Sequence, residues 1–264
     1  MFNNKRFLII ILFGVVITIY TLYQTGVYQK NLLLFTNDYT IDYPFSVFNT
    51  FILCNPFCYS GIILVYCLPV LSCLPYGDSL YTDIKSGHIK IILCKVSKKK
   101  YYMSKFITVF ISGFMVGFII LSLNLILTMM FFPSIKPEGI SNLYPLTARF
   151  VYMNTLYIDS PYLYCIFYLI INCMYCGMYA LISLVATLLF EYRATIILFP
   201  GIFMMFINRL LIEICLGRFS TQLFLFPFSQ IENCSALNMI SVCVVYIACI
   251  FIFVLLKEKN RDVF

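Results

Sequence analysis

The chain has 264 residues, of which 62% are hydrophobic and 11% are charged, and its formal net charge is +7. A soluble domain carries roughly 25% charged residues, and its core cannot grow large enough to bury so much apolar surface. The composition therefore excludes a water-soluble globular protein and predicts a membrane protein. The basic residues flank apolar runs, where the positive-inside rule explains them, so no nucleic-acid partner is expected.

Six apolar runs predict an all-α polytopic membrane protein with six transmembrane helices in a single domain, residues 1–264. A helix needs about 20 apolar residues to cross a bilayer. The first run resembles a signal peptide, but residues 23–26 form no small-residue cleavage site, so we expect an uncleaved span. Residues 24–55 are expected to form an outside loop. The predicted spans cover residues 7–23, 56–76, 106–132, 162–190, 194–208 and 237–256.

The segment before the last span is expected to be broken. Pro200 and Gly201 interrupt the fifth apolar run, and the apolar patch at 223–228 is too short to cross a bilayer. We expect residues 208–236 to re-enter the membrane or to lie on its surface, covered by other helices, because lipid cannot satisfy irregular backbone. Arg209 and Glu213 are spaced i, i+4, which suits an interfacial ion pair or a gate.

Lysine and arginine predict the orientation of the spans. With both termini in the cytoplasm, 13 of these residues lie inside and 5 lie outside, and the inverted arrangement reverses this ratio. Because cytoplasmic loops carry the excess of positive charge, we expect a multi-pass protein of the plasma membrane with both termini cytoplasmic.

Residues 85–105 form the most distinctive segment, because they hold seven of the eighteen Lys and Arg residues. Four apolar residues within it recur at i, i+3, i+4 and i+7, which is the spacing of one helix face. The segment is predicted to lie on the inner membrane surface with its apolar side down and its lysines in the headgroup zone. It is also the best candidate for a docking surface. The four apolar residues are Ile89, Ile92, Leu93 and Val96.

Polar residues and cysteines inside the apolar runs have two interpretations. Asn124 and Asn172 suit hydrogen bonds between helices, and a contact with a transported substrate is the less favoured alternative. Cys173 and Cys176 form a Cys-x-x-Cys pattern, but no second pair or histidine accompanies it, so metal or redox chemistry is not favoured. Cys54 and Cys58 lie near the predicted outer surface, where a disulfide is possible but not required.

The sequence holds no set of residues that would make this chain an enzyme. It has no P-loop motif for a nucleotide, and His88 is its single histidine. We therefore expect no catalytic residues, no metal and no cofactor. Charged residues are almost missing from the centres of the spans, which argues against an ion-coupled transporter.

The layout of the spans resembles that of permease subunits of bacterial type-2 ABC exporters. The local match lies between the second and third spans, where Asp83, Gly87, the pair Ser97–Lys98, and Lys105 occupy the positions of a loose family pattern. The resemblance implies that this segment is the element coupled to a separate cytosolic ABC ATPase, and that a second permease copy or a homologue completes the pathway. The implied coupling residues are Asp83, Gly87, Ile89, Ile92, Leu93, Val96, Lys98 and Lys105, with Glu191 and Arg193 as a second contact.

The resemblance thus implies the membrane-spanning subunit of an ATP-driven exporter of a lipid, a peptide or a drug, with the lipid bilayer around it. An alternative is a non-transporting accessory or immunity protein that binds a partner through the same lysine-rich segment. The substrate-binding subunit of a vitamin importer is disfavoured, because the first span lacks an Ala-x-x-x-Ala face.

Overall fold

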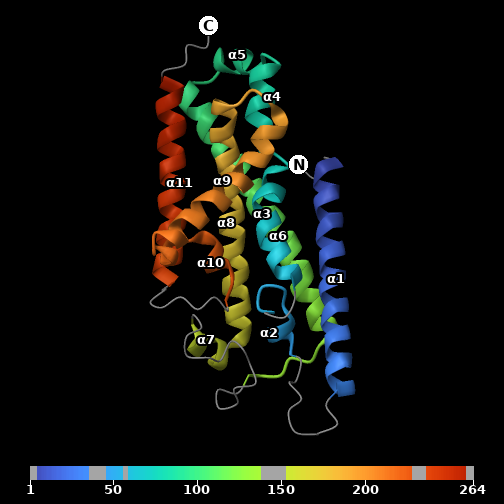
Figure 1. Cartoon of the computed structure of the whole chain (residues 1–264). Helices are drawn as coiled ribbons and strands as arrows, with labels where there is room; N and C mark the ends of the chain where they lie inside the picture. Colours follow the sequence, from blue (N-terminus) through green and yellow to red (C-terminus); the bar gives the residue numbers. More distant parts are fainter. Residues whose placement is uncertain (1–4, 36–45, 56–58, 138–152, 228–235, 260–264) are drawn as a thin grey trace.

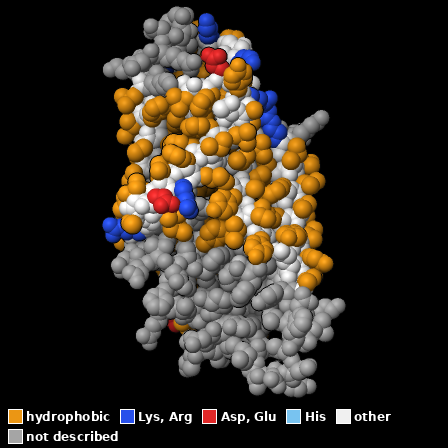
Figure 2. Space-filling view, viewed as in Figure 1, with side chains coloured by type: hydrophobic (Ala, Val, Ile, Leu, Met, Phe, Trp, Pro, Cys, Tyr) orange, Lys and Arg blue, Asp and Glu red, His pale blue; other side chains and the backbone are white. Residues whose placement is uncertain are grey.

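The computed structural model describes residues 5–35, 46–55, 59–137, 153–227 and 236–259 (Figure 1). All regular elements in these ranges are helices, and five helices are long and apolar enough to cross a membrane. In Figure 2, hydrophobic side chains cover most of the described part of the visible face, with charged side chains at its upper end and in a second group lower on the left. The predicted all-α polytopic membrane protein is thereby confirmed. The five helices are α1 (Lys5–Phe35), α6 (Lys98–Phe131), α8 (Pro161–Leu189), α9 (Arg193–Glu213) and α11 (Ala236–Lys259).

The second predicted span is shorter than expected. Helix α3 (Tyr59–Cys73) has 15 residues and contains Pro69. At 1.5 Å per residue it is about 22 Å long, which is less than the roughly 30 Å of a bilayer's hydrocarbon core. The chain leaves the helix at a turn that contains Pro75, so the span predicted at 56–76 is helical only in its middle part.

Residues 46–55 lie beside α3 and occupy the part of the membrane thickness that this short helix does not reach. They contain the one-turn helix α2 (Val47–Thr50) followed by a turn, and they are buried almost throughout. Their backbone donors are satisfied by α6 and the residues after it: Val47 N–H donates to the carbonyl of Pro133 at 3.1 Å, and Ile52 N–H donates to Asn124 Oδ1 at 3.1 Å. Irregular backbone is tolerated at membrane depth when protein covers it in this way.

The loop predicted at 24–55 is therefore corrected in two respects. Helix α1 continues to Phe35, and residues 46–55 lie among the helices instead of in an outside loop. Cys54 has a buried, free thiol, and Cys58 lies outside the described residues.

Helix α8 is the centre of the bundle and is buried along most of its length. Helix α6 packs closely against it, and α3, α9 and α11 contact it on other sides. Close packing requires glycine in α6, because a Cβ at Gly113 would lie 2.6 Å from the Ala180 Cβ and from the Cys176 carbonyl oxygen. Helix α1 lies at the edge and contacts α6, where a Cβ at Gly14 would meet Ile120 at 2.9 Å.

The fifth span is longer than predicted, since α9 continues through Pro200 and Gly201 to Glu213. A Cβ at Gly201 would lie 2.7 Å from a Val70 methyl group, so the glycine allows α9 to approach α3 closely. The Arg209–Glu213 pair forms as an exposed contact of 3.1 Å, which is the predicted ion pair.

After α9 the chain turns back into the bundle in short pieces, within the segment predicted to be broken at 208–236, of which residues 228–235 lie outside the described residues. These pieces are η2 (Gly217–Phe219) and α10 (Thr221–Leu225). Asn208 fixes the start of α10 against α9, because its Oδ1 accepts hydrogen bonds of 3.1 Å from the Ser220 and Thr221 hydroxyl groups. All three side chains are buried.

The start of α1 and the end of α11 lie toward the same end of the bundle, where two short helices, α4 (Ser79–Lys85) and α5 (His88–Leu93), extend farthest (Figure 1). This end also carries the lysines of residues 85–105, and we call it the lysine end. The opposite end, where residues 46–55 lie, is called the far end.

Candidate functional site

Helices α4 and α5 form the candidate site, and Gly87 joins them. Its φ of 70° lies in the left-handed region, which glycine adopts without the strain of other residues. This conformation lets the chain leave α4 and begin α5 within two residues. No atom lies within 4 Å of a Cβ placed at Gly87, so the position requires glycine for its backbone and not for space.

Asp83 fixes α4 to the first turns of α6. Its Oδ2 lies 2.8 Å from Lys105 Nζ and accepts a hydrogen bond of 2.6 Å from the Tyr101 hydroxyl. Helix α6 begins at Lys98, well before the span predicted at 106–132, so both partners belong to one rigid helix. The resemblance singled out Asp83 and Lys105 as separate positions, and the structure joins them in one ion pair.

The surroundings of Asp83 keep its carboxyl group ionised. Partial burial alone raises its pKa, but hydrogen bonds from Lys105 and Tyr101 and the nearby charges of Lys105 and His88 outweigh that effect. The net result is a pKa below the ordinary value of an aspartate. At neutral pH the tie between α4 and α6 is therefore charged.

The apolar residues predicted on one face at 89–96 divide into two groups. Ile89 is buried, and Ile92 and Leu93 pack against the protein core. Helix α5 ends at Leu93, so Val96 lies beyond the helix and is exposed. The expected membrane-facing side is corrected: α5 packs against α6, and its apolar side meets protein. The exposed apolar side chain of α5 is Ile91, at 61% exposure, which the pattern did not single out.

The lysines of this segment form a positive surface around α5. Lys105 is half-buried in its ion pair, whereas the other six are exposed. None of those six forms an ion pair with another residue of the described ranges. The surface presents strong positive charge around an exposed Ile91, which suits a partner with acidic and apolar groups. The six are Lys85, Lys90, Lys95, Lys98, Lys99 and Lys100.

A buried ion cluster, which the sequence did not predict, lies beside this site. The Asp78 side chain is 5% exposed and accepts from Arg6 Nη1, which is 2.9 Å from both carboxylate oxygens. Arg193 Nε donates to the same carboxylate. The cluster joins the first turn of α1, the turn before α4 and the first residue of α9.

The two residues predicted to form a second contact with the ATPase, Glu191 and Arg193, have different surroundings. Arg193 turns its guanidinium to Asp78, although 49% of its side chain is exposed. Glu191 is exposed between α8 and α9 and has no ion-pair partner in the described part of the chain. The available signal was weak: Asp78, Arg6 and Arg193 all flank apolar runs at the same predicted membrane side.

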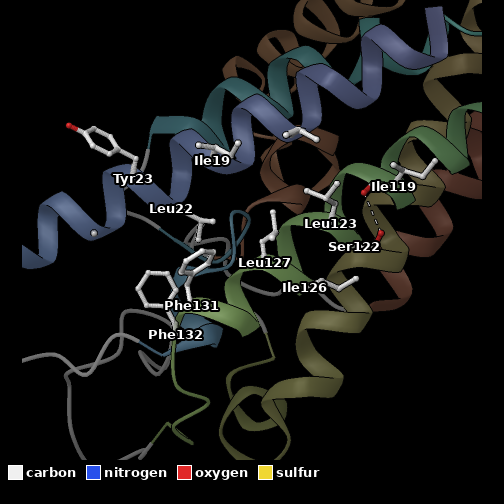
Figure 3. Close-up of a pocket in the computed structure, with 12 residues that line it drawn as sticks. Ile19, Leu22, Tyr23, Ile119, Ser122, Leu123, Ile126, Leu127, Phe131 and Phe132 are labelled. Carbon is white, nitrogen blue, oxygen red and sulfur yellow. Dashed lines mark hydrogen bonds between the residues drawn. The ribbon is translucent and has the colours of Figure 1, made fainter. Parts of the chain in front are cut away.

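An apolar groove lies between α1 and α6 on the far-end side of the Gly14–Ile120 contact. Its volume is about 1020 Å³. Figure 3 shows side chains of both helices bordering it, with Tyr23 directed away from Phe131 and Phe132. The Ser122 hydroxyl donates to the Ile119 carbonyl at 3.3 Å, so it is engaged within its own helix. The groove suits an apolar molecule and offers little to orient a polar one. Its lining residues are Val15, Ile19, Leu22, Tyr23, Gly26, Ile119, Ser122, Leu123, Ile126, Leu127, Phe131 and Phe132.

The two asparagines within the spans do not join long helices to one another. Asn124 accepts from the Ile52 backbone and so holds residues 46–55 against α6, whereas Asn172 Nδ2 donates to the Tyr168 carbonyl of its own helix at 2.9 Å. Asn124 Nδ2 and Asn172 Oδ1 are buried without a hydrogen-bond partner among the described residues. Their principal contacts are structural.

Comparison with known proteins adds no relative to this description. No family model matches the chain, and neither a curated protein nor a solved structure is significantly similar to it. In the ranges that the structure describes, no three His, Cys, Asp or Glu side chains are grouped to hold a metal ion.

Proposed function

We propose that the chain is the membrane-spanning permease subunit of an ABC transporter, an exporter driven by a separate cytosolic ATPase. The observation that carries the proposal is the unit of α4 and α5, which extends past the start of α1 and is tied to α6 through Asp83 and Lys105. A partner that pushes on this unit acts on a rigid helix of 34 residues. The lysine end is then the cytoplasmic end, in the plasma membrane.

The exposed surface of the unit supports docking of a protein partner. Ile91 is an apolar side chain at 61% exposure among exposed lysines, on a part of the chain outside the long spans. An apolar anchor with charges around it is the usual composition of a docking patch. We assign Ile91 and the two exposed lysines that flank it in the sequence, Lys90 and Lys95, to contact with the ATPase. Asp83 and Gly87 shape the unit.

The Arg6–Asp78–Arg193 cluster supports transmission of movement from α4. Asp78 directly precedes α4, and its two partners begin α1 and α9. Displacement of α4 therefore acts on α1 and α9 as well as on α6. An ATPase that binds two states of this arrangement with different affinity shifts the population between them.

The apolar groove between α1 and α6 supports an apolar cargo such as a lipid, a hydrophobic peptide or a drug. Its surface comes from α1, which lies at the edge of the bundle, and from α6, against which α1 chiefly packs. In this proposal a second permease copy or a homologue completes the pathway.

Co-purification tests the proposal. The tagged chain is isolated from its native membrane in mild detergent, and its partners are identified by mass spectrometry. We expect a stoichiometric cassette ATPase, which is lost in Ile91→Glu and retained in Lys136→Glu, a control at an exposed position near the far end. Recovery of no ATPase under conditions that keep a known exporter intact would contradict the proposal and favour a non-transporting accessory protein.

A further inference from the structure

One side of α6 near the lysine end carries two parallel rows of residues at i, i+4 and i+8. The first row is Lys99, Met103 and Ile107, and the second is Lys100, Ser104 and Thr108. Together they border a shallow groove of about 490 Å³. Each row begins with an exposed lysine, and Met103 and Ile107 are 41% and 50% exposed.

The first row lies on a different side of α6 from the residues that bind α4. Tyr101 and Lys105 hold Asp83, and at 3.6 residues per turn they lie across the helix from Lys99, Met103 and Ile107, whereas the second row lies between the two sides. Lys99 and Lys100 form no ion pair with any carboxylate of the described residues. Their charges are therefore available to an anionic ligand, independently of the coupling role proposed for α4 and α5.

We propose that this groove binds an anionic phospholipid of the leaflet at the lysine end. Lys99 and Lys100 bind the phosphate, Ser104 lies at the depth of the glycerol esters, and Met103 and Ile107 contact the first part of an acyl chain. From Lys99 to Ile107 the helix rises about 12 Å, which spans the boundary between headgroups and acyl chains. The positive, hydroxyl and apolar groups follow one another along α6 in the same order as the phosphate, the glycerol esters and the acyl chains of the lipid.

The apolar half of the groove favours a lipid over a free phosphate ion. A phosphate ion bound at Lys99 and Lys100 leaves Met103 and Ile107 without a partner, whereas an acyl chain covers them. Thr108 adds no competing polar group, because its hydroxyl donates to the Ser104 carbonyl at 2.7 Å. A neutral phospholipid offers the same chains without net negative charge, so selectivity rests on the two lysines.

Native mass spectrometry of the purified full chain, titrated with phosphatidylglycerol in detergent, tests the proposal. Juxtamembrane lysines contribute roughly fivefold each to the binding of anionic lipid, so the paired variant Lys99→Gln, Lys100→Gln should bind about 30-fold more weakly. The pair Lys99→Arg, Lys100→Arg should retain binding. The control pair Lys90→Gln, Lys95→Gln removes two exposed lysines outside the groove and should leave the affinity unchanged.

Three further comparisons make the test specific. Phosphatidylcholine should bind more weakly than phosphatidylglycerol, and inorganic phosphate should not displace the bound lipid. Ile107→Ser leaves the charge unaltered and should weaken binding while preserving the preference for the anionic lipid, which gives a second test if the lysine pair fails to fold. Equal binding by wild type and the Lys99, Lys100 glutamine variant, an equal loss in the control pair, or displacement by phosphate would overturn the proposal.

Discussion

Arg6 in the first turn of α1 places its Nη1 2.9 Å from both carboxylate oxygens of Asp78, which lies 72 residues away in the sequence. Arg193 donates to the same carboxylate from the first residue of α9. One buried carboxylate therefore holds two helices at the place where the chain enters α4. In the proposed mechanism, this is the point at which movement of the docking unit reaches the edge of the bundle.

Replacement of Asp78 by Asn should destabilise the protein, because two guanidinium groups lose their counter-ion. Breaking a fully buried pair costs roughly 3–5 kcal/mol, but both arginines are partly exposed, so we expect about 2 kcal/mol. Thermal unfolding in detergent measures the effect. Asp159→Asn, at an exposed carboxylate on another part of the chain, is the control and should leave the midpoint unaltered.

Acidification should release the tie between Asp83 and α6. The native pKa of Asp83 lies below its value in the unfolded chain, so its contribution to stability is complete above the unfolded pKa and is lost as the pH falls through the native one. The gap in unfolding midpoint between wild type and Asp83→Asn should be largest near neutral pH and should close below about pH 4. Tyr101→Phe should give a smaller gap. A gap between wild type and Asp83→Asn that stays constant with pH would show that the charge of Asp83 contributes nothing.

The contact between α6 and α8 should tolerate no methyl group at Gly113. In Gly113→Ala the new Cβ meets Ala180 and the backbone of Cys176 at 2.6 Å, and overpacking of this kind costs about 1–3 kcal/mol. Gly26→Ala in α1 is the matched control, because nothing lies within 4 Å of its Cβ. The control should be neutral or slightly stabilising in the same unfolding measurement. Equal effects of the two substitutions would contradict the close approach.

Asn124 should keep residues 46–55 closed against the bundle. Asn124→Ala leaves the buried Ile52 N–H without an acceptor, which costs roughly 1–3 kcal/mol, and local opening should increase. Cys54 reports the opening, because its buried thiol becomes accessible to a maleimide and is identified by peptide mapping. We expect labelling to be roughly 5- to 150-fold faster in Asn124→Ala. Asn172→Ala should label at the wild-type rate, since Asn172 bonds within its own helix.

The long helices were predictable because each is an apolar run of sufficient length. The depth of α3 was not, since hydropathy cannot distinguish a short apolar helix from a buried turn such as 51–54. The burial of residues 46–55 depends on Asn124, which accepts a hydrogen bond from the Ile52 N–H 72 residues earlier in the chain. A local sequence pattern cannot predict a contact between residues so far apart.

The site was predictable in outline and not in its pairings. The resemblance picked out Asp83, Gly87 and Lys105, but the contact of Asp83 with Lys105 depends on α6 beginning as early as Lys98. The apolar spacing within α5 was correct as a helix face, although periodicity alone does not tell whether protein or lipid covers that face. The sequence around Asp78 does not indicate which residues it pairs with, since its two partners lie far from it on opposite sides in the sequence.

The burial of the tyrosines was also not predictable from the sequence alone. Tyrosine prefers the membrane interface, so this preference alone places tyrosines at the ends of spans. Four others lie on α8 and are fully buried, because α8 is the central helix and its neighbours cover it on most sides. Which of several equally apolar runs occupies the centre is decided by packing between helices. The four are Tyr164, Tyr168, Tyr175 and Tyr179.

Photo-crosslinking from Ile91 in intact cells tests the central claim, that the α4–α5 unit docks a cytosolic ATPase, most directly. A benzophenone amino acid replaces Ile91 in one sample and Leu198, an exposed apolar residue of α9, in the other. The account predicts an adduct with a cassette ATPase from position 91 and none from position 198. Absence of an ATPase adduct from position 91, in cells where the protein is inserted and stable, would contradict it.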